Sequence, residues 1–255
     1  MASKKSNAFW VVLVSQFIGL GFLCLLVITS AEPFPCGKII LFASLAGIIG
    51  QAGLVALYRG LAPGRMSIVA PLSAMIGALV AVIFGSWTEG APDRLQTVGF
   101  CLALLAVWLV SRAEGKWQVK RDELGFSCVA GMCFGIYFIF IDLVSNQAVF
   151  WPLTSARLAS VALAALIVII TRPSPRPGLR QIPLMALAGI LDSAGNLFFA
   201  LATRLGRMDV AVILSSLYPA VTVLLAFMLL SERLSARQWV GVVMSLFAVW
   251  LININ

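Results

Sequence analysis

The sequence predicts an all-α integral membrane protein with nine transmembrane helices in an inverted repeat. First, 61% of its 255 residues are hydrophobic, 11% are charged and the mean hydropathy is +1.03, a balance foreign to soluble domains. Second, nine apolar segments are long enough to cross a hydrocarbon layer of roughly 30 Å as helices, which satisfy their own backbone groups there. Third, the chain resembles itself when Leu45 is aligned with Leu187.

The apolar segments follow one another through short linkers, which leave no room for a soluble domain. Lys4 and Lys5 before the first segment, and "ITSAEP" after it, also imitate a cleaved secretory signal. We favour a transmembrane helix because the run is long, contains Ser15 and Gln16, and belongs to the repeat. The nine segments are residues 8–29, 38–58, 66–86, 95–110, 124–143, 150–170, 182–203, 209–230 and 236–252.

The repeat aligns "LAGIIGQAG" from Leu45 with "LAGILDSAG" from Leu187, and "LLAVWL" from Leu104 with "LFAVWL" from Leu246. Without a gap, 20 of 65 positions are identical. This alignment maps helices one to four onto helices six to nine and leaves helix five without a counterpart. The sequence thus predicts two five-helix units, residues 1–112 with the first helix absent and residues 124–255. An odd number of helices inserts the two copies in opposite directions.

Capping boxes recur at equivalent places in the repeat, which supports its register. Asp93 with Gln96, and Ser235 with Gln238, fit the pattern that starts a helix. We expect helices to begin directly after Asp93 and Ser235.

Composition also excludes several classes of function. The chain has no histidine, so histidine catalysis and histidine metal ligation are excluded, and we expect no cofactor, no metal and no enzyme activity. Cys128 and Cys133 are five residues apart and suit packing better than a metal site. No basic run is interleaved with aromatic residues, which argues against a nucleic-acid partner.

Loop charges predict the orientation in the membrane. The loops on the side of the N-terminus hold 13 Lys and Arg residues, and the opposite loops hold 4. The positive-inside rule places the N-terminus in the cytoplasm and the C-terminus outside, in a multi-pass protein of the inner or plasma membrane.

The stretch "AVILSSLYPAVTVLLAFMLLSERLSARQWVGVVMSLFAVWLI" resembles the second repeat of the drug/metabolite transporter superfamily, in its ten-helix EamA-like branch. The resemblance implies export, or less often import, of amino acids and other small metabolites by alternating access. It also implies that both termini are cytoplasmic, which differs from the charge count. The residues that carry it are Ser215, Ser216, Tyr218, Pro219, Glu232 and Gly241.

Polar side chains inside the spans point to a transport site. Asp192 and Asn196 share one face of helix seven, and an ionised group near the bilayer centre usually faces a cavity or a partner. Arg157 in helix six lies about 6 Å away in height at 1.5 Å per residue, within an arginine's reach. A purely structural ion pair is the alternative.

Gln16 lies one residue from the place that corresponds to Arg157, and Gln51 corresponds to Ser193; both also suit simple interhelical hydrogen bonds. Pro219 either kinks its helix or frees the Ser215 carbonyl for a ligand, and with Pro71 is a candidate for gating. The predicted substrate-binding residues are Asp192, Arg157, Asn196, Tyr218, Gln16, Gln51, Tyr137 and Phe199.

We therefore expect a secondary transporter that exports an amino acid or similar small metabolite by alternating access. Its expected partners are the substrate, a coupling proton and membrane lipid. Gly131 and Gly135 form a GxxxG face that suits close packing or a homodimer. The alternatives are a transport-inactive or truncated membrane scaffold and a multidrug or cation exporter.

Overall fold

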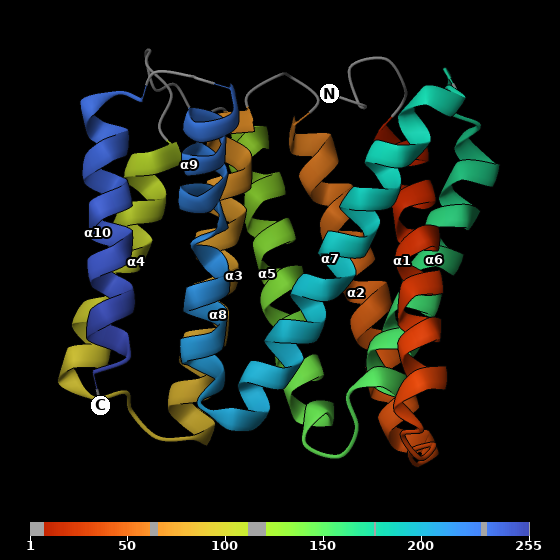
Figure 1. Cartoon of the computed structure of the whole chain (residues 1–255), viewed down its shortest axis with the longest axis horizontal. Helices are drawn as coiled ribbons and strands as arrows, with labels where there is room; N and C mark the ends of the chain where they lie inside the picture. Colours follow the sequence, from red (N-terminus) through yellow and green to blue (C-terminus); the bar gives the residue numbers. More distant parts are fainter. Residues whose placement is uncertain (1–7, 62–65, 112–120, 176, 231–233, 255) are drawn as a thin grey trace. The chain divides into compact units, whose positions relative to one another are not determined.

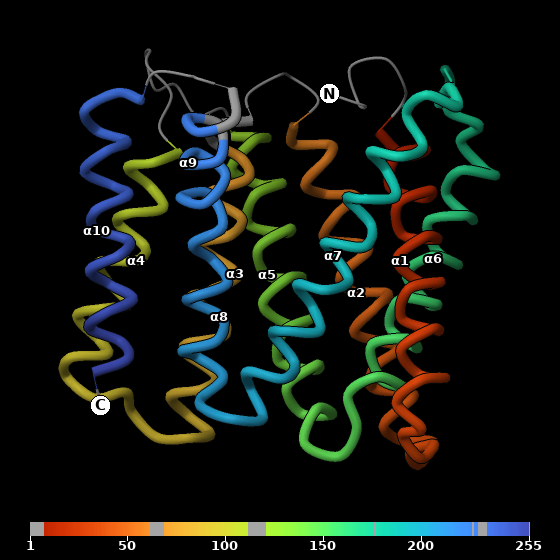
Figure 2. The backbone as a smooth tube through the Cα atoms, in the orientation of Figure 1, coloured from red at the N-terminus to blue at the C-terminus, as the bar shows by residue number. Residues whose placement is uncertain are grey.

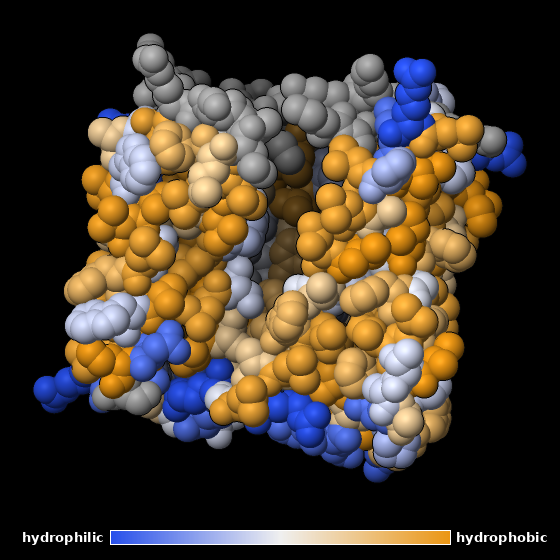
Figure 3. All heavy atoms as spheres, in the orientation of Figure 1, coloured by the Kyte–Doolittle hydropathy of each residue, from blue (hydrophilic) through white to orange (hydrophobic). Residues whose placement is uncertain are grey.

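The computed structural model describes residues 8–61, 66–111, 121–175, 177–230 and 234–254, and every regular element among them is a helix (Figure 1). Eight helical stretches are long and apolar enough to span a membrane, and a shorter apolar helix follows them. In Figure 3 hydrophobic residues cover the middle of the visible face, and hydrophilic residues gather along its lower edge. The all-α membrane fold is thus confirmed.

The helix bounds agree with the predicted segments to within three residues at each end. The exception is the segment 209–230, which forms two helices. The elements are α1 (Ala8–Ser30), α2 (Gly37–Leu61), α3 (Met66–Thr88), α4 (Arg94–Ser111), α5 (Arg121–Ser145), α6 (Phe150–Thr171), the short η2 (Leu179–Gln181), α7 (Ile182–Leu205), α8 (Met208–Ser216), α9 (Tyr218–Leu230) and α10 (Ala236–Ile252).

The break between α8 and α9 falls at Leu217, two residues before Pro219. Proline has no N–H, so Pro219 cannot donate to the carbonyl of Ser215. Directly after the break, the Leu217 carbonyl accepts a hydrogen bond from the N–H of Ala220 at 2.9 Å. In Figure 2, α9 continues from α8. Pro71 lies inside α3 without breaking it.

The chain forms two compact units. Unit 1 contains Met1–Ala52 and Tyr137–Leu205, and unit 2 contains Gly53–Ile136 and Gly206–Asn255. Since α2 and α5 each contribute to both units, the units do not coincide with the predicted repeats 1–112 and 124–255. The division into repeats stays a prediction.

In unit 2, α4 and α10 lie side by side and contact each other reciprocally (Figure 1). A Cβ atom added to Gly99 of α4 would lie 2.6 Å from Cγ1 of Ile252, and one added to Gly241 of α10 would lie 2.6 Å from Cγ2 of Val110. The repeat alignment relates the two contacts, because it pairs Gly99 with Gly241 and Val110 with Ile252. In an inverted repeat, a residue of the first copy and its counterpart in the second copy are expected to make equivalent contacts with each other's copy, as these two glycines do.

The GxxxG face of α5 also packs inside unit 2. A Cβ atom at Gly131 would lie 2.6 Å from Cβ of Ile76, and one at Gly135 would lie 2.7 Å from Cβ of Val80, both in α3. Glycine at these positions lets the two helices approach closely. The packing interpretation of this motif is confirmed.

Unit 1 contains a similar pair of reciprocal glycine contacts, and they are closer than those of unit 2. A Cβ atom on Gly47 of α2 would collide with the backbone carbonyl of Ala156 in α6, and one on Gly189 of α7 would collide with that of Ser15 in α1. The repeat alignment pairs Gly47 with Gly189, and it places Ser15 one residue out of register with Ala156. These contacts hold together the four helices that carry most of the candidate site.

Candidate functional site

The predicted ion pair is present in unit 1, between α6 and α7. Nη2 of Arg157, on α6, lies 2.7 Å from Oδ2 of Asp192, on α7. The arginine side chain is only 9% exposed, whereas the aspartate side chain is 59% exposed. The carboxylate of the pair is therefore accessible, whereas its guanidinium is buried.

Two buried glutamines support the arginine from behind. Nη1 of Arg157 donates to Oε1 of Gln16 at 3.3 Å, and Nε2 of Gln16 donates to Oε1 of Gln51 at 2.8 Å. Gln16 and Gln51 are buried, at only 4% and 2% exposed. The structure thus joins these residues from α1, α2 and α6 in one network.

Ser160 belongs to this network, although the sequence analysis did not single it out. Its hydroxyl lies 2.8 Å from Oε1 of Gln16 and 3.0 Å from Oε1 of Gln51, so it can donate to either amide. Ser160 follows Arg157 by one turn, on the same face of α6. That spacing is the signal that could have identified it.

Asn196 links the ion pair to α5. Its Nδ2 donates to the backbone carbonyl of Asp192 at 2.8 Å, and its Oδ1 accepts from the hydroxyl of Tyr137 at 2.9 Å. The ring of buried Phe199 packs on Phe138, with centroids 4.6 Å apart. The predicted residues Asp192, Arg157, Asn196, Gln16, Gln51 and Tyr137 therefore form one hydrogen-bonded cluster, with Phe199 in the aromatic packing of the same unit.

The other predicted residues belong to unit 2. Tyr218 is 48% exposed at the start of α9, beside Pro219, and Pro71 lies in α3. Glu232, part of the family pattern, lies outside the described residues.

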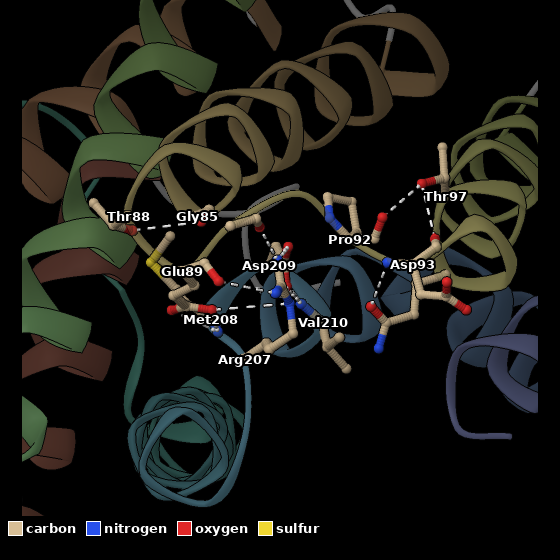
Figure 4. Close-up of polar contacts among 12 residues, drawn as sticks. Gly85, Thr88, Glu89, Pro92, Asp93, Thr97, Arg207, Met208, Asp209 and Val210 are labelled. Carbon is tan, nitrogen blue, oxygen red and sulfur yellow. Dashed lines mark hydrogen bonds and ion pairs between the residues drawn. The ribbon is translucent and has the colours of Figure 1, made fainter. Parts of the chain in front are cut away.

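Unit 2 carries its own ion pair at the start of α8 (Figure 4). Nη2 of Arg207 lies 2.7 Å from Oδ2 of fully buried Asp209, and this hydrogen bond raises the pKa of Arg207 above its ordinary value. Arg207 also donates to the carbonyls of Glu89 and Gly90, and the Glu89 carboxylate accepts from the N–H of Met208. This cluster ties the loop after α3 to a helix terminus.

At the start of α6, the carboxylate of Glu32 accepts from the backbone N–H groups of Val149, Phe150 and Trp151 at 2.8 to 3.1 Å. Helix N-termini leave such donors unsatisfied, and a negative charge suits the helix dipole there. Glu32 was not identified from the sequence, because no local pattern connects it with residues so far along the chain.

Among the described residues, no group of three or more histidine, cysteine, aspartate or glutamate side chains gathers where it could hold a metal ion. The polar cluster of unit 1 instead offers one carboxylate, one guanidinium, amides and hydroxyls. Such a set can bind and release a small polar molecule.

Comparisons with known proteins bear on the family and the fold of the chain. The EamA-like transporter family matches residues 123–254, just over half of the chain. A comparison with curated protein sequences finds no match. One solved crystal structure is similar with a TM-score of 0.82 at 16% sequence identity, over 96% of this chain and 88% of that chain, a likeness that concerns the fold alone. The chain belongs to the EamA-like transporter family.

Proposed function

We propose that the chain is a secondary transporter that exports a small metabolite, such as an amino acid, by alternating access. Membership of a transporter family supports the reaction class. The direction follows the resemblance to family members that export metabolites. The site is the ion pair of Arg157 and Asp192 with the residues that hold it.

The observation that carries the proposal is a carboxylate more than half exposed near the middle of a membrane span. Asp192 lies close to the midpoint of α7, which runs from Ile182 to Leu205. An ionised side chain at such a depth costs at least ~2.5 kcal/mol in hydrocarbon, so its open side should face water or a ligand. A site of this kind binds differently in two conformations when the substrate alters the ion pair in one of them.

Metabolite profiling of a deletion strain against an overexpressing strain would identify the substrate class. Counterflow in liposomes then tests the reaction, because only a carrier exchanges labelled for unlabelled substrate. We expect exchange by the wild type and a loss of at least tenfold per folded molecule in Asp192→Asn. The proposal is wrong if the wild type carries out no exchange of any metabolite that the profiling identifies.

A double variant separates transport from a purely structural ion pair. Asp192→Asn combined with Arg157→Gln removes both charges and leaves no buried charge without a partner. We expect it to remain inactive. Restored exchange in the double variant would establish that the pair only holds α6 and α7 together.

A further inference from the structure

We infer that Asp192 recognises the substrate through an ammonium group, and that Arg157 serves to hold Asp192 rather than to bind a substrate carboxylate. This inference rests on the proposed function, because it names the chemical class that the same site selects. Its basis is the unequal exposure of the two charged side chains, 59% for Asp192 and 9% for Arg157.

Arg157 is already engaged by protein groups. One terminal nitrogen contacts Oδ2 of Asp192 at 2.7 Å and the other donates to Oε1 of Gln16 at 3.3 Å. Gln16 is in turn fixed by Gln51 and Ser160. A substrate carboxylate would have to displace Asp192 from this buried guanidinium, which would leave the aspartate charge without its counter-ion.

The carboxylate of Asp192 can accept further hydrogen bonds. An ionised carboxylate has about four lone-pair sites, and the contact with Arg157 uses Oδ2. The amide of Asn196 donates to the backbone carbonyl of Asp192, not to its carboxylate. An ammonium group can therefore bind Oδ1 while Arg157 stays on Oδ2.

Charge decides between ligand classes at this surface. An approaching anion meets the exposed carboxylate first and is repelled, whereas an ammonium group is attracted to it. The expected order of binding is amine at least as tight as zwitterion, and both tighter than anion. The substrate's own carboxylate, when it has one, adds no affinity here.

Three probes with the same four-carbon chain test this order: n-butylamine, 4-aminobutyrate and butyrate. We expect the first two, at millimolar concentration, to raise the Tm of the purified wild-type protein in detergent, and butyrate to leave it unchanged. Asp192→Asn should remove the shifts, and Arg157→Gln should lower the apparent Kd for butylamine several-fold, because it frees the carboxylate. A sodium chloride series at equal ionic strength controls for salt effects.

Stabilisation by butyrate in the wild type would overturn the inference, as would shifts that persist in Asp192→Asn. If Arg157→Gln fails to fold, the order of the three probes on the wild type and on Asp192→Asn still decides. Counterflow of an anionic metabolite, with no response to amines, would overturn ammonium recognition while the transport proposal stands. Absence of all exchange would instead overturn the transport proposal.

Discussion

Units 1 and 2 differ in where they place their charges. In unit 1 an ion pair joins two spans, near the middle of α7 and within α6, and is linked to buried amides and a buried hydroxyl. In unit 2 the pair of Arg207 and Asp209 lies at the beginning of α8, where it satisfies helix-terminal groups (Figure 4). Charged side chains within a span are costly unless they face a ligand or a partner, whereas charges at the beginning of a helix make ordinary helix-end contacts. We therefore place the proposed function in unit 1 and expect the charges of unit 2 to serve stability.

The two units also differ in the atoms that pack against their interhelical glycines. In unit 1, Gly189 lies against the backbone carbonyl of Ser15, which has no rotamer with which to move away. In unit 2, the closest atom to a Cβ added at Gly241 belongs to the side chain of Val110. The helices around the ion pair are therefore held by the less adaptable contact.

The largest effect is expected from Gly189→Ala. The added methyl group must displace the α1 backbone, at a cost of about 3 kcal/mol in the free energy of unfolding, the upper end of what overpacking usually costs. Folded yield measured by size-exclusion chromatography in detergent should fall sharply, and further than in Gly241→Ala. Gly195→Ala, on the same helix but with open space around the position, is the matched control and should fold as well as the wild type. Equal yields from Gly189→Ala and Gly195→Ala would refute the close contact.

An intermediate effect is expected from Ser160→Ala. The variant removes a donor shared by Gln16 and Gln51, at a cost of about 1 kcal/mol, and loosens the support of Arg157. Thermal unfolding should show a lower Tm, and counterflow should show a partial loss of rate. Ser155→Ala is the control, because Ser155 lies on the same helix and donates to the carbonyl of Trp151 within that helix. A variant of Ser160 with the wild-type rate would show that the network does not position Arg157.

The smallest effect is expected from Glu32→Gln. Glutamine keeps one acceptor oxygen and loses the charge at the N-terminus of α6, so the expected cost is about 0.5 to 1 kcal/mol. The Tm should fall slightly while the transport rate per folded molecule stays unchanged. Loss of transport at unchanged Tm would place a functional group at this end of unit 1 and weaken the contrast with unit 2.

Much of the fold follows from the sequence because hydrophobic length and helix geometry act locally. Runs of apolar residues fix the helix bounds, and the capping box at Ser235 and Gln238 is confirmed at the start of α10. The rise per residue was sufficient to predict that Arg157 reaches Asp192.

The repeat alignment could also have located a reciprocal pair of hydrogen bonds. The indole of Trp10 donates to the carbonyl of Pro173, and the indole of Trp151 donates to the carbonyl of Glu32. Within one residue of register, the alignment pairs the two tryptophans with each other and Glu32 with Pro173. Positions that the alignment makes equivalent in the two predicted repeats thus take part in both hydrogen bonds.

The rest depended on geometry that no local pattern encodes. The exposure of Asp192 and the burial of Arg157 follow from how α6 and α7 are rotated against their neighbours, and helix period alone left both open. The contacts of Glu32 and of Arg207 depend on loop conformations, and loops lack the periodic signal that predicts helices. The interruption at Leu217 was suggested by Pro219, but its form, two helices in succession, was not.

The most direct measurement compares Asp192→Asn with Asp209→Asn in the same counterflow assay, each normalised to folded protein. The account predicts that folded Asp192→Asn loses at least tenfold in exchange rate, and that its folded yield also falls because buried Arg157 loses its counter-ion. It predicts that Asp209→Asn lowers the folded yield, because Arg207 loses its buried partner, while the folded fraction exchanges at the wild-type rate. Wild-type exchange by Asp192→Asn, or loss of exchange confined to folded Asp209→Asn, would contradict the assignment of function to unit 1.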